Sequence, residues 1–471
     1  MAAGLAQHGQ TVTVTPPSLR VGTDCSGAEA PIWSMRAMQL VHQHIFSSDI
    51  GRAPQLMIAA NTKPTVMYKN LVKRRSCEVP AVDLYVAGFP CTPFSMLHNN
   101  SKLFKEKAAR PLFKILQMLR RSDGPPAAVL ENVTGILRVQ EQVLKLFRNA
   151  GYVVVMLQMD PTHLGEPVAR PRVHFLMVKA AFAIGPVAAM ETVVRSVWSS
   201  LKAPSMTSLT LRCLPPQHPE VERVMRKRKA KFLVAQRHHF PGRKKAPRWP
   251  AKHKAFLASG GARKCSRRSG ASTVQRSTCS ADMLLLSNPR ERSAWSIWSS
   301  SSSGSLTADL SQSVDRTSGR VDGAAPTITP GSIIASAQLG RTIVPLEKLM
   351  LHAFPIHRMV IPKGVTDADL ESLGGNTMHV MCVGVAIVMV LRMVNWAKAR
   401  QGHNRTSDAP DRLTSQGQRS ASFKSGPRTG ARLVADTVKR KILKSSQPRA
   451  MKAQQRRMTQ HGTKGLRSRW G

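Results

Sequence analysis

Short apolar runs alternate with helix-like stretches over the first third of the chain. A run of about four to eight apolar residues predicts a buried strand, and apolar residues recurring every three or four positions predict a helix. Strands are predicted at 19–22, 44–49, 82–87, 127–130, 152–159 and 173–178, and helices at 31–41, 102–121 and 141–150. This alternation indicates an α/β fold, a doubly wound, mostly parallel sheet of the Rossmann-like kind with helices on both faces.

Polar side chains stand where several of these strands end. The residues at these positions are Asp24, Asp49, Cys91 and Glu131. Ligands of open α/β sheets bind outside the carboxyl ends of the strands. Four reactive or polar residues at one edge of the sheet therefore predict a functional site there.

Beyond residue 180 the periodic pattern weakens and basic residues take its place. Residues 221–268 contain 17 Lys or Arg and one acid, and 299–305 is a serine-rich linker. Apolar order returns at 326–396, whereas 397–471 carries 19 basic residues against three acids and has no sustained period, which is typical of disorder. The predicted divisions are a leader (1–18), a first domain (19–180), a basic insert (181–325), a segment that returns to the first domain (326–396) and a basic disordered tail (397–471).

Charge and cysteine usage narrow the class of protein. The formal net charge of +44 favours nucleic acid as the partner, with an anionic membrane surface or merely solubilising tails as alternatives. Seven scattered cysteines without a CxxC pair predict a reducing compartment and no metal site. The N-terminus has no secretory pattern, and the longest apolar run, 380–391, is shorter than the roughly 20 residues of a membrane span, so a buried helix and no membrane partner are predicted.

The stretch AGFPCTPFS, residues 87–95, follows the third predicted strand. An isolated cysteine is most often a small buried hydrophobe. Here Pro90 and Pro93 restrict the backbone on both sides of Cys91, which suits a thiol that must be aimed at a substrate. A cysteine nucleophile reacts as the thiolate and needs positive charge nearby, and Arg170 and Arg172 in GEPVARPR can supply it.

Four motifs in order resemble the motif series of cytosine-5 DNA methyltransferases. AGFPCTPFS is followed by LENV at 130–133, GEPVARPR at 165–172 and GGNTMHV at 374–380. The resemblance covers about 19–180 and 326–396, so it implies a catalytic and cofactor-binding domain built from both segments. It makes Cys91 the nucleophile that adds to carbon 6 of cytosine, and Glu131 the group that holds the ring nitrogen and exocyclic amine. Arg170 and Arg172 would orient the base and the catalytic loop, Arg170 being the stronger candidate for catalysis.

The same resemblance implies S-adenosylmethionine as methyl donor. The first strand would open a glycine-containing loop around the methionine part, and the acid after the second strand would bind the ribose hydroxyls. The cofactor-binding residues implied are Asp24, Ser26, Gly27, Asp49, Asn70, Pro90, Asn376 and Thr377. The chain departs from the family pattern at Cys25, where an aromatic residue is usual, at Glu29, where a second glycine is usual, and at Thr92, Val168 and Asn70.

The basic insert lies where the family places its target-recognition region. Candidate DNA contacts are Arg226, Lys227, Arg228, Lys229, Arg243, Lys244, Lys245, Gln312 and Arg316, with solvated disorder as the alternative for the basic clusters. The prediction is therefore a DNA (cytosine-5-)-methyltransferase. The alternatives are the same chemistry on RNA and a decayed domain that only binds nucleic acid. Lys439, Arg440 and Lys441 suit nuclear import, and the sequence leaves the oligomeric state open.

Overall fold

The computed structural model describes residues 18–96, 102–203, 205–237, 254–255, 258, 281, 283–301, 305–315 and 319–407. The predicted leader up to residue 17, much of the basic insert and the tail beyond residue 407 lie outside these residues. All statements below concern the described part of the chain.

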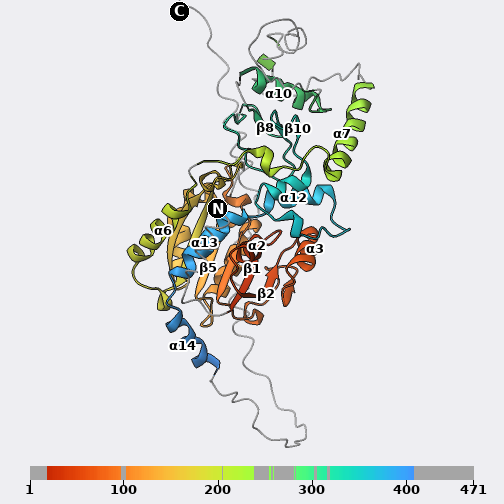
Figure 1. The fold of residues 1–471 in the computed structure, drawn as a ribbon. Helices are drawn as coiled ribbons and strands as arrows, with labels where there is room; N and C mark the ends of the chain where they lie inside the picture. The colour runs from red at the N-terminus through yellow and green to blue at the C-terminus, as the bar shows by residue number, and fades with distance from the viewer. Residues whose placement is uncertain are drawn as a thin grey trace, which may run out of the picture. The chain divides into compact units, whose positions relative to one another are not determined.

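A seven-stranded sheet forms the centre of the fold, with strand order β3-β2-β1-β4-β5-β7-β6 (Figure 1). The strands are β1 (Leu19–Asp24), β2 (His42–Ser48), β3 (Val66–Tyr68), β4 (Leu84–Ala87), β5 (Ala127–Val133), β6 (Tyr152–Met159) and β7 (Arg172–Lys179). The pairings from β3 through β5 are parallel, and β7 runs antiparallel to both β5 and β6. The predicted α/β fold with a doubly wound, mostly parallel sheet is confirmed.

Helices cover both faces of the sheet because successive strand residues point to opposite sides. The helices of the sheet region are α2 (Ala30–Ala37), α3 (Arg52–Asn61), α4 (Arg110–Leu119), α5 (Gln140–Arg148), α6 (Val187–Leu201), α12 (Asp367–Asn376) and α13 (Val380–Arg392). Val129 of β5 packs on the side of α2, α6 and α13, whereas Leu130 packs on the side of α4 and α5. Two separate hydrophobic cores therefore hold the sheet between them.

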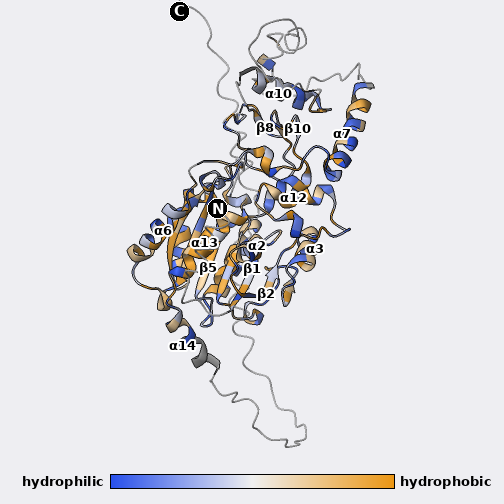
Figure 2. Ribbon diagram, viewed as in Figure 1, coloured by the Kyte–Doolittle hydropathy of each residue, from blue (hydrophilic) through white to orange (hydrophobic). Residues whose placement is uncertain are grey.

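The C-terminal helix α13 lies beside strands that are more than two hundred residues earlier in the chain. It contacts α2, β5 and β7 and is buried along nearly its whole length (Figures 1 and 2). By length and composition alone, Asp367–Arg392 could cross a membrane, but 89% of the apolar window is buried inside the protein. Its burial matches the buried helix expected from the run 380–391. The helix α6 also packs on the sheet, although it falls within the segment predicted as insert.

A smaller sheet follows the basic helix α7 (Pro219–Arg237) in the sequence. Its strands β8 (Thr307–Asp309), β9 (Ile334–Ser336) and β10 (Arg341–Thr342) pair in the order β10-β9-β8. Helix α10 (Pro289–Ser301) packs on it through Trp295 and Trp298. Two further helices, α11 (Pro345–Met350) and α14 (Trp396–Ser407), complete the described α-helices.

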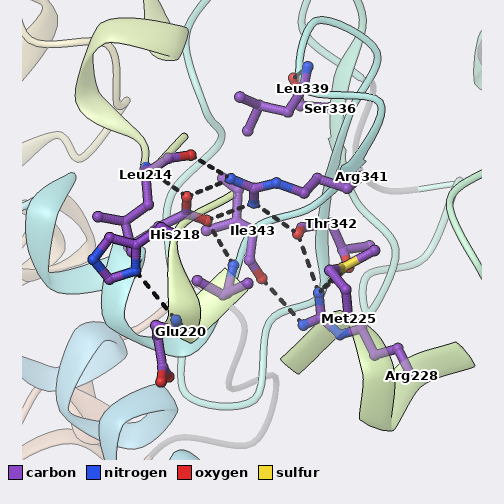
Figure 3. A network of polar contacts seen from close by, with 12 residues as sticks. Leu214, His218, Glu220, Met225, Arg228, Ser336, Leu339, Arg341, Thr342 and Ile343 are labelled. Atoms are coloured by element: carbon purple, nitrogen blue, oxygen red, sulfur yellow. Dashed lines mark hydrogen bonds and ion pairs between the residues drawn. The ribbon is translucent and has the colours of Figure 1, made fainter. Parts of the chain in front are cut away.

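A buried ion pair joins this smaller sheet to the segments on either side of it (Figure 3). The guanidinium of Arg341 donates to both carboxylate oxygens of Glu347, at 2.8 and 2.7 Å, and to the carbonyl of Leu214 at 2.9 Å. Glu347 also accepts from the backbone N–H of Leu214 and of Val344, both at 2.8 Å. Every lone-pair direction of this buried carboxylate thus meets a donor, which offsets its loss of hydration.

Two local differences from the sequence-based prediction have simple physical causes. The helix expected over 102–121 is regular only at Arg110–Leu119, and two 3₁₀ turns precede Pro111, whose ring fits the first turn of a helix. The strand expected to end at residue 130 continues to Val133 because β7 pairs with it through Arg172. Glu131 therefore lies within β5, one residue beyond its pairing with β4.

We predict that Arg341→Ala lowers the free energy of unfolding by about 3–5 kcal/mol, because it leaves the carboxylate of Glu347 buried and unpaired. Urea unfolding followed by tryptophan fluorescence measures the change. Arg320→Ala is the matched control, since its partner Asp322 is half exposed, and it should cost less than about 1 kcal/mol. Equal losses in the two variants would contradict the assignment.

Candidate active site

The register between β4 and β5 places two predicted catalytic residues at one edge of the sheet. The parallel pairing ends at Ala87 opposite Leu130. The residues that follow lie side by side beyond the last pair. They are Gly88 to Cys91 after β4 and Glu131 on β5. The side-chain amide of Asn132 donates to the carbonyl of Phe89 at 3.0 Å and ties the two segments together beyond the pairing.

Cys91 directly precedes a short 3₁₀ helix, Thr92–Phe94, which is held by a backbone hydrogen bond and by a buried ring. The N–H of Phe94 donates to the carbonyl of Cys91 at 2.8 Å, and the ring of Phe94 is buried against Phe89 and Phe104. Cys91 itself keeps solvent-exposed surface. The pKa of the Cys91 thiol is raised above its ordinary value, chiefly by desolvation; Glu131 adds to this shift, and Arg172 and Arg170 oppose it. The thiol is thus held on a rigid turn within the field of one carboxylate and two guanidinium groups.

Glu131 and Arg172 form an ion pair, with 3.1 Å between Oε1 of Glu131 and Nε of Arg172. Both side chains are largely buried. The other oxygen, Oε2, faces Gly88, where an added Cβ would stand only 3.3 Å from it. One oxygen of the carboxylate is therefore held by Arg172, and the other lies close to the backbone at Gly88.

Arg170 is placed differently from Arg172. Its guanidinium donates to the carbonyls of Ile328 at 3.0 Å, Gly375 at 3.1 Å and Thr377 at 2.7 Å. Burial and, to a smaller extent, the nearby charge of Arg172 lower the pKa of Arg170 to about 9. The guanidinium of Arg170 is thus bonded to backbone oxygens of the returning segment, whereas Arg172 pairs with Glu131. The ranking of Arg170 above Arg172 as the catalytic arginine stays a prediction.

The loop after β1 has an unusual backbone. Cys25, Gly27 and Glu29 all adopt left-handed conformations, with φ of 52°, 61° and 64°. The N–H of Gly27 donates to Oδ2 of Asp49 at 3.2 Å, and the N–H of Gly51 donates to Oδ1 at 2.9 Å. Burial raises the pKa of Asp49, while these amides act in the opposite direction. The loop and the acid at the end of β2 therefore form one hydrogen-bonded unit.

Two residues assigned to the cofactor from the sequence are occupied by internal contacts. Asp24 is fully buried and accepts from Arg74, with 2.7 Å to one oxygen, and from the hydroxyl of Tyr85 at 2.6 Å. Oδ1 of Asn70 accepts the N–H of Val72 at 2.9 Å and so shapes the turn after β3. Arg74 was missed from the sequence, because nothing distinguishes it from its basic neighbours before the fold places it against β1.

Thr377 closes this region from the C-terminal side. Its side chain is buried and packs against Gly27, where an added Cβ would stand 3.3 Å from the Cβ of Thr377. Its hydroxyl makes no hydrogen bond to any part of the chain that the structure describes. A buried unbonded hydroxyl beside a glycine loop and a carboxylate fits a polar ligand such as S-adenosylmethionine.

The remaining cofactor candidates lie around this centre. Ser26 is buried and turns its hydroxyl to Glu29 at 2.8 Å. Pro90 is half-buried between β4 and Cys91, and Asn376 is exposed, with its amide 3.4 Å from the hydroxyl of Ser372. Within the described ranges, no group of three or more His, Cys, Asp or Glu side chains is arranged to hold a metal ion.

The predicted DNA contacts on α7 are not equivalent. Arg226 and Lys229 are exposed, and Lys227 lies 3.1 Å from Asp367. Arg228 is corrected from a phosphate contact to a structural residue, because its guanidinium donates to the carbonyls of Thr342 and Ile343, each at 3.1 Å (Figure 3). Gln312 is half-buried and its amide donates to the hydroxyl of Ser311 at 3.3 Å. Four others lie outside the described residues: Arg243, Lys244, Lys245 and Arg316.

Curated relatives of this chain include eukaryotic and bacterial enzymes. It is 26% identical over 179 residues to DNA (cytosine-5-)-methyltransferase DMT5 of Cryptococcus neoformans, covering 33% of this chain and 7% of the relative. It is 29% identical over 136 residues to type II methyltransferase M.BsuFI of Bacillus subtilis, covering 27% of this chain and 32% of the relative. The chain thus spans less than two thirds of either relative.

Solved structures with a similar chain path include the Dnmt2 methyltransferase of S. pombe and the methyltransferase EhMeth of Entamoeba histolytica. Each has a TM-score of 0.47 and 14% sequence identity. The alignments cover 79% and 80% of this chain and 98% and 99% of the solved chains. The family model described as C-5 cytosine-specific DNA methylase matches residues 25–362. With the motif order and the sheet topology, this match shows that the chain belongs to the C-5 cytosine-specific DNA methylase family.

Proposed function

We propose that this chain transfers a methyl group from S-adenosylmethionine to carbon 5 of cytosine in DNA, through a covalent bond between Cys91 and the base. The observation that carries the proposal is the meeting of Cys91, Glu131 and Arg172 at one edge of the sheet, next to a loop and a threonine that fit the cofactor. Family membership supplies the reaction class.

The thiolate of Cys91 adds to carbon 6, forming a sulfur–carbon bond while the electrons of the 5,6 double bond move toward carbon 5 and the ring. Glu131 binds the ring nitrogen and the exocyclic amine and so stabilises the charge that develops there. Arg172 orients Glu131 through its ion pair and keeps positive charge beside the thiol. After carbon 5 is methylated, loss of its proton expels the thiolate and restores the double bond.

The cofactor supplies an electrophilic methyl group on a sulfonium when bound. Asp49 is placed to accept from ribose hydroxyls, and Gly27 lets the backbone approach closely without a side chain. The hydroxyl of Thr377, which packs beside Gly27, has no partner among the described residues and can bond the ligand. Together these three residues bind and orient the donor over the edge where Cys91 stands.

DNA is the proposed substrate, and RNA is the alternative. The exposed Arg226 and Lys229 on α7 can contact phosphates, and the high positive charge of the chain favours a polyanion. A cytosine inside a duplex must be extruded before carbon 6 can reach a thiol, at a cost of a few kcal/mol that such contacts offset. Nuclear localisation is likewise proposed, from the basic cluster at 439–441, which lies outside the described residues.

Cys91→Ser should abolish both methyl transfer and covalent capture of the substrate. The protein is incubated with labelled S-adenosylmethionine and duplex DNA or RNA containing 5-fluorocytosine, and adducts are resolved on denaturing gels. Wild type should form an adduct with DNA because fluorine at carbon 5 blocks the elimination step. An adduct with RNA alone would show that RNA, not DNA, is the substrate. DNA binding without an adduct or methyl transfer would support the alternative of a decayed domain that only binds nucleic acid.

Glu131→Gln should keep the affinity for S-adenosylmethionine and lower kcat by roughly 10²–10⁴-fold, the usual contribution of such a group. The amide retains the shape of the side chain but not its charge. Calorimetry for the cofactor and single-turnover methylation separate the two effects. Equal losses in cofactor affinity and rate would show that Glu131 acts through the structure of the site.

Arg172→Ala should raise the pKa of the Cys91 thiol, because the positive charge is removed and Glu131 is left unpaired beside it. The pH dependence of iodoacetamide labelling, read by peptide mass spectrometry, measures this pKa. Arg172→Lys should restore most of the wild-type profile, and the exposed Cys77 serves as an internal control. An unchanged profile for Cys91 in Arg172→Ala would refute the electrostatic role.

A further inference from the structure

Glu29 is a fully buried carboxylate in the loop after β1, at a position where the family pattern has glycine. Its Oε1 accepts hydrogen bonds from three hydroxyls, those of Thr23 at 2.9 Å, Ser26 at 2.8 Å and Ser47. Nε2 of His44 lies 3.2 Å from the hydroxyl of Thr23 and 3.8 Å from Oε1. One oxygen atom therefore collects donors from β1, from the loop and from β2.

The backbone conformation and the buried side chain of Glu29 are both unusual for glutamate. Glu29 has φ of 64° and ψ of 47°, a left-handed conformation that glycine adopts without strain and glutamate does not. It stands at the N-cap of α2, yet its side chain makes no capping hydrogen bond to that helix. Its second oxygen, Oε2, is buried and bonds to none of the described residues. Strain and buried polar groups of this kind concentrate at functional sites.

The contacts of Glu29 fix the parts of the site that would hold the donor. Ser26 is the neighbour of Gly27, whose N–H donates to Asp49. Ser47 lies two residues before Asp49 at the end of β2. The N–H of Glu29 also donates to the carbonyl of Ser26 at 3.0 Å, which closes the loop on itself. A substitution at Glu29 should therefore alter the positions of both the loop and Asp49, the acid proposed to bind the ribose.

We propose that Glu29 is a positioning residue of the cofactor site, which holds the 24–29 loop and Asp49 in binding geometry through the hydroxyls of Thr23, Ser26 and Ser47. The inference rests on the proposed function, since it concerns the same donor site. Where glycine occupies this position, the compact backbone orders the loop. In this chain, the carboxylate of Glu29 and its three hydroxyl donors take over that task. It also accounts for a strained, buried glutamate that does not cap its own helix.

Glu29→Ala should raise the dissociation constant for S-adenosylmethionine roughly tenfold or more, as expected for the loss of the three hydrogen bonds that order the site. Glu29→Gln keeps an acceptor oxygen for the three hydroxyls and should recover most of the affinity. Calorimetry on the full chain with S-adenosylmethionine and S-adenosylhomocysteine gives the constants, and thermal melting is recorded for every variant. Ser47→Ala leaves the carboxylate in place and should cause a smaller loss of cofactor affinity. This variant tests the proposal if Glu29→Ala does not fold.

The role is separated from general destabilisation by two controls. Asp83→Ala removes the pair of Asp83 with Arg20 at the opposite end of β1, and it should lower the melting temperature without changing cofactor affinity. Glu29→Ala combined with Asp49→Ala should lose little more affinity than Asp49→Ala alone, because coupled residues are not additive. Affinity within twofold of wild type in folded Glu29→Ala, or full additivity with Asp49→Ala, overturns the proposal. Failure of wild type to bind S-adenosylmethionine would instead refute the proposed function.

Discussion

The parallel register of β4 and β5 is the constraint on which the candidate site depends. Because the last pair of the two strands is Ala87 and Leu130, the segment from β4 to Cys91 begins beside Glu131 of β5. A one-residue shift would turn Glu131 to the opposite face, since side chains alternate along a strand. Apolar residues of both strands lie in the two cores, so any such shift would also expose them. Burial of the strands thereby fixes the position of the Cys91 loop relative to the Glu131 carboxylate.

Several arginines pair with buried carboxylates inside the protein. Arg74 neutralises the buried Asp24 and stacks on the rings of Phe46 and Tyr68. Arg341 pairs with Glu347 in the smaller sheet region. The planar fork of arginine suits such tasks, because it donates to two or three acceptors at once while its charge persists when buried. The net charge of +44 therefore does not tell which arginines are available to a partner.

Sequence periodicity predicted six of the seven strands of the main sheet and the helices α2, α4, α5 and α13, because burial repeats every two or about four residues wherever an element has one apolar face. It missed strand β3 and the other described α-helices. It could not predict that β7 inserts antiparallel between β5 and β6, since the order of strands in a sheet depends on packing far along the chain. The motifs led to Cys91, Glu131 and both arginines, yet only the fold separates Arg172, paired with Glu131, from Arg170, bonded to carbonyls. Glu29 stood out as a departure from the pattern, but its hydroxyl partner Ser47 is contributed by another strand.

Arg170 explains how a long insert can interrupt such a site without disturbing it. Its three acceptors, the carbonyls of Ile328, Gly375 and Thr377, lie 158 to 207 residues later in the sequence. The segment that carries Arg172 is therefore joined directly to the segment that carries Thr377, whatever lies between them in the chain. Because loop-closure entropy grows only slowly with length, one strong multidentate contact, together with the burial of α13, can hold the ends of an insert of variable size. The same side chain adds positive charge near Cys91, so one arginine positions Thr377 and acts on the thiol.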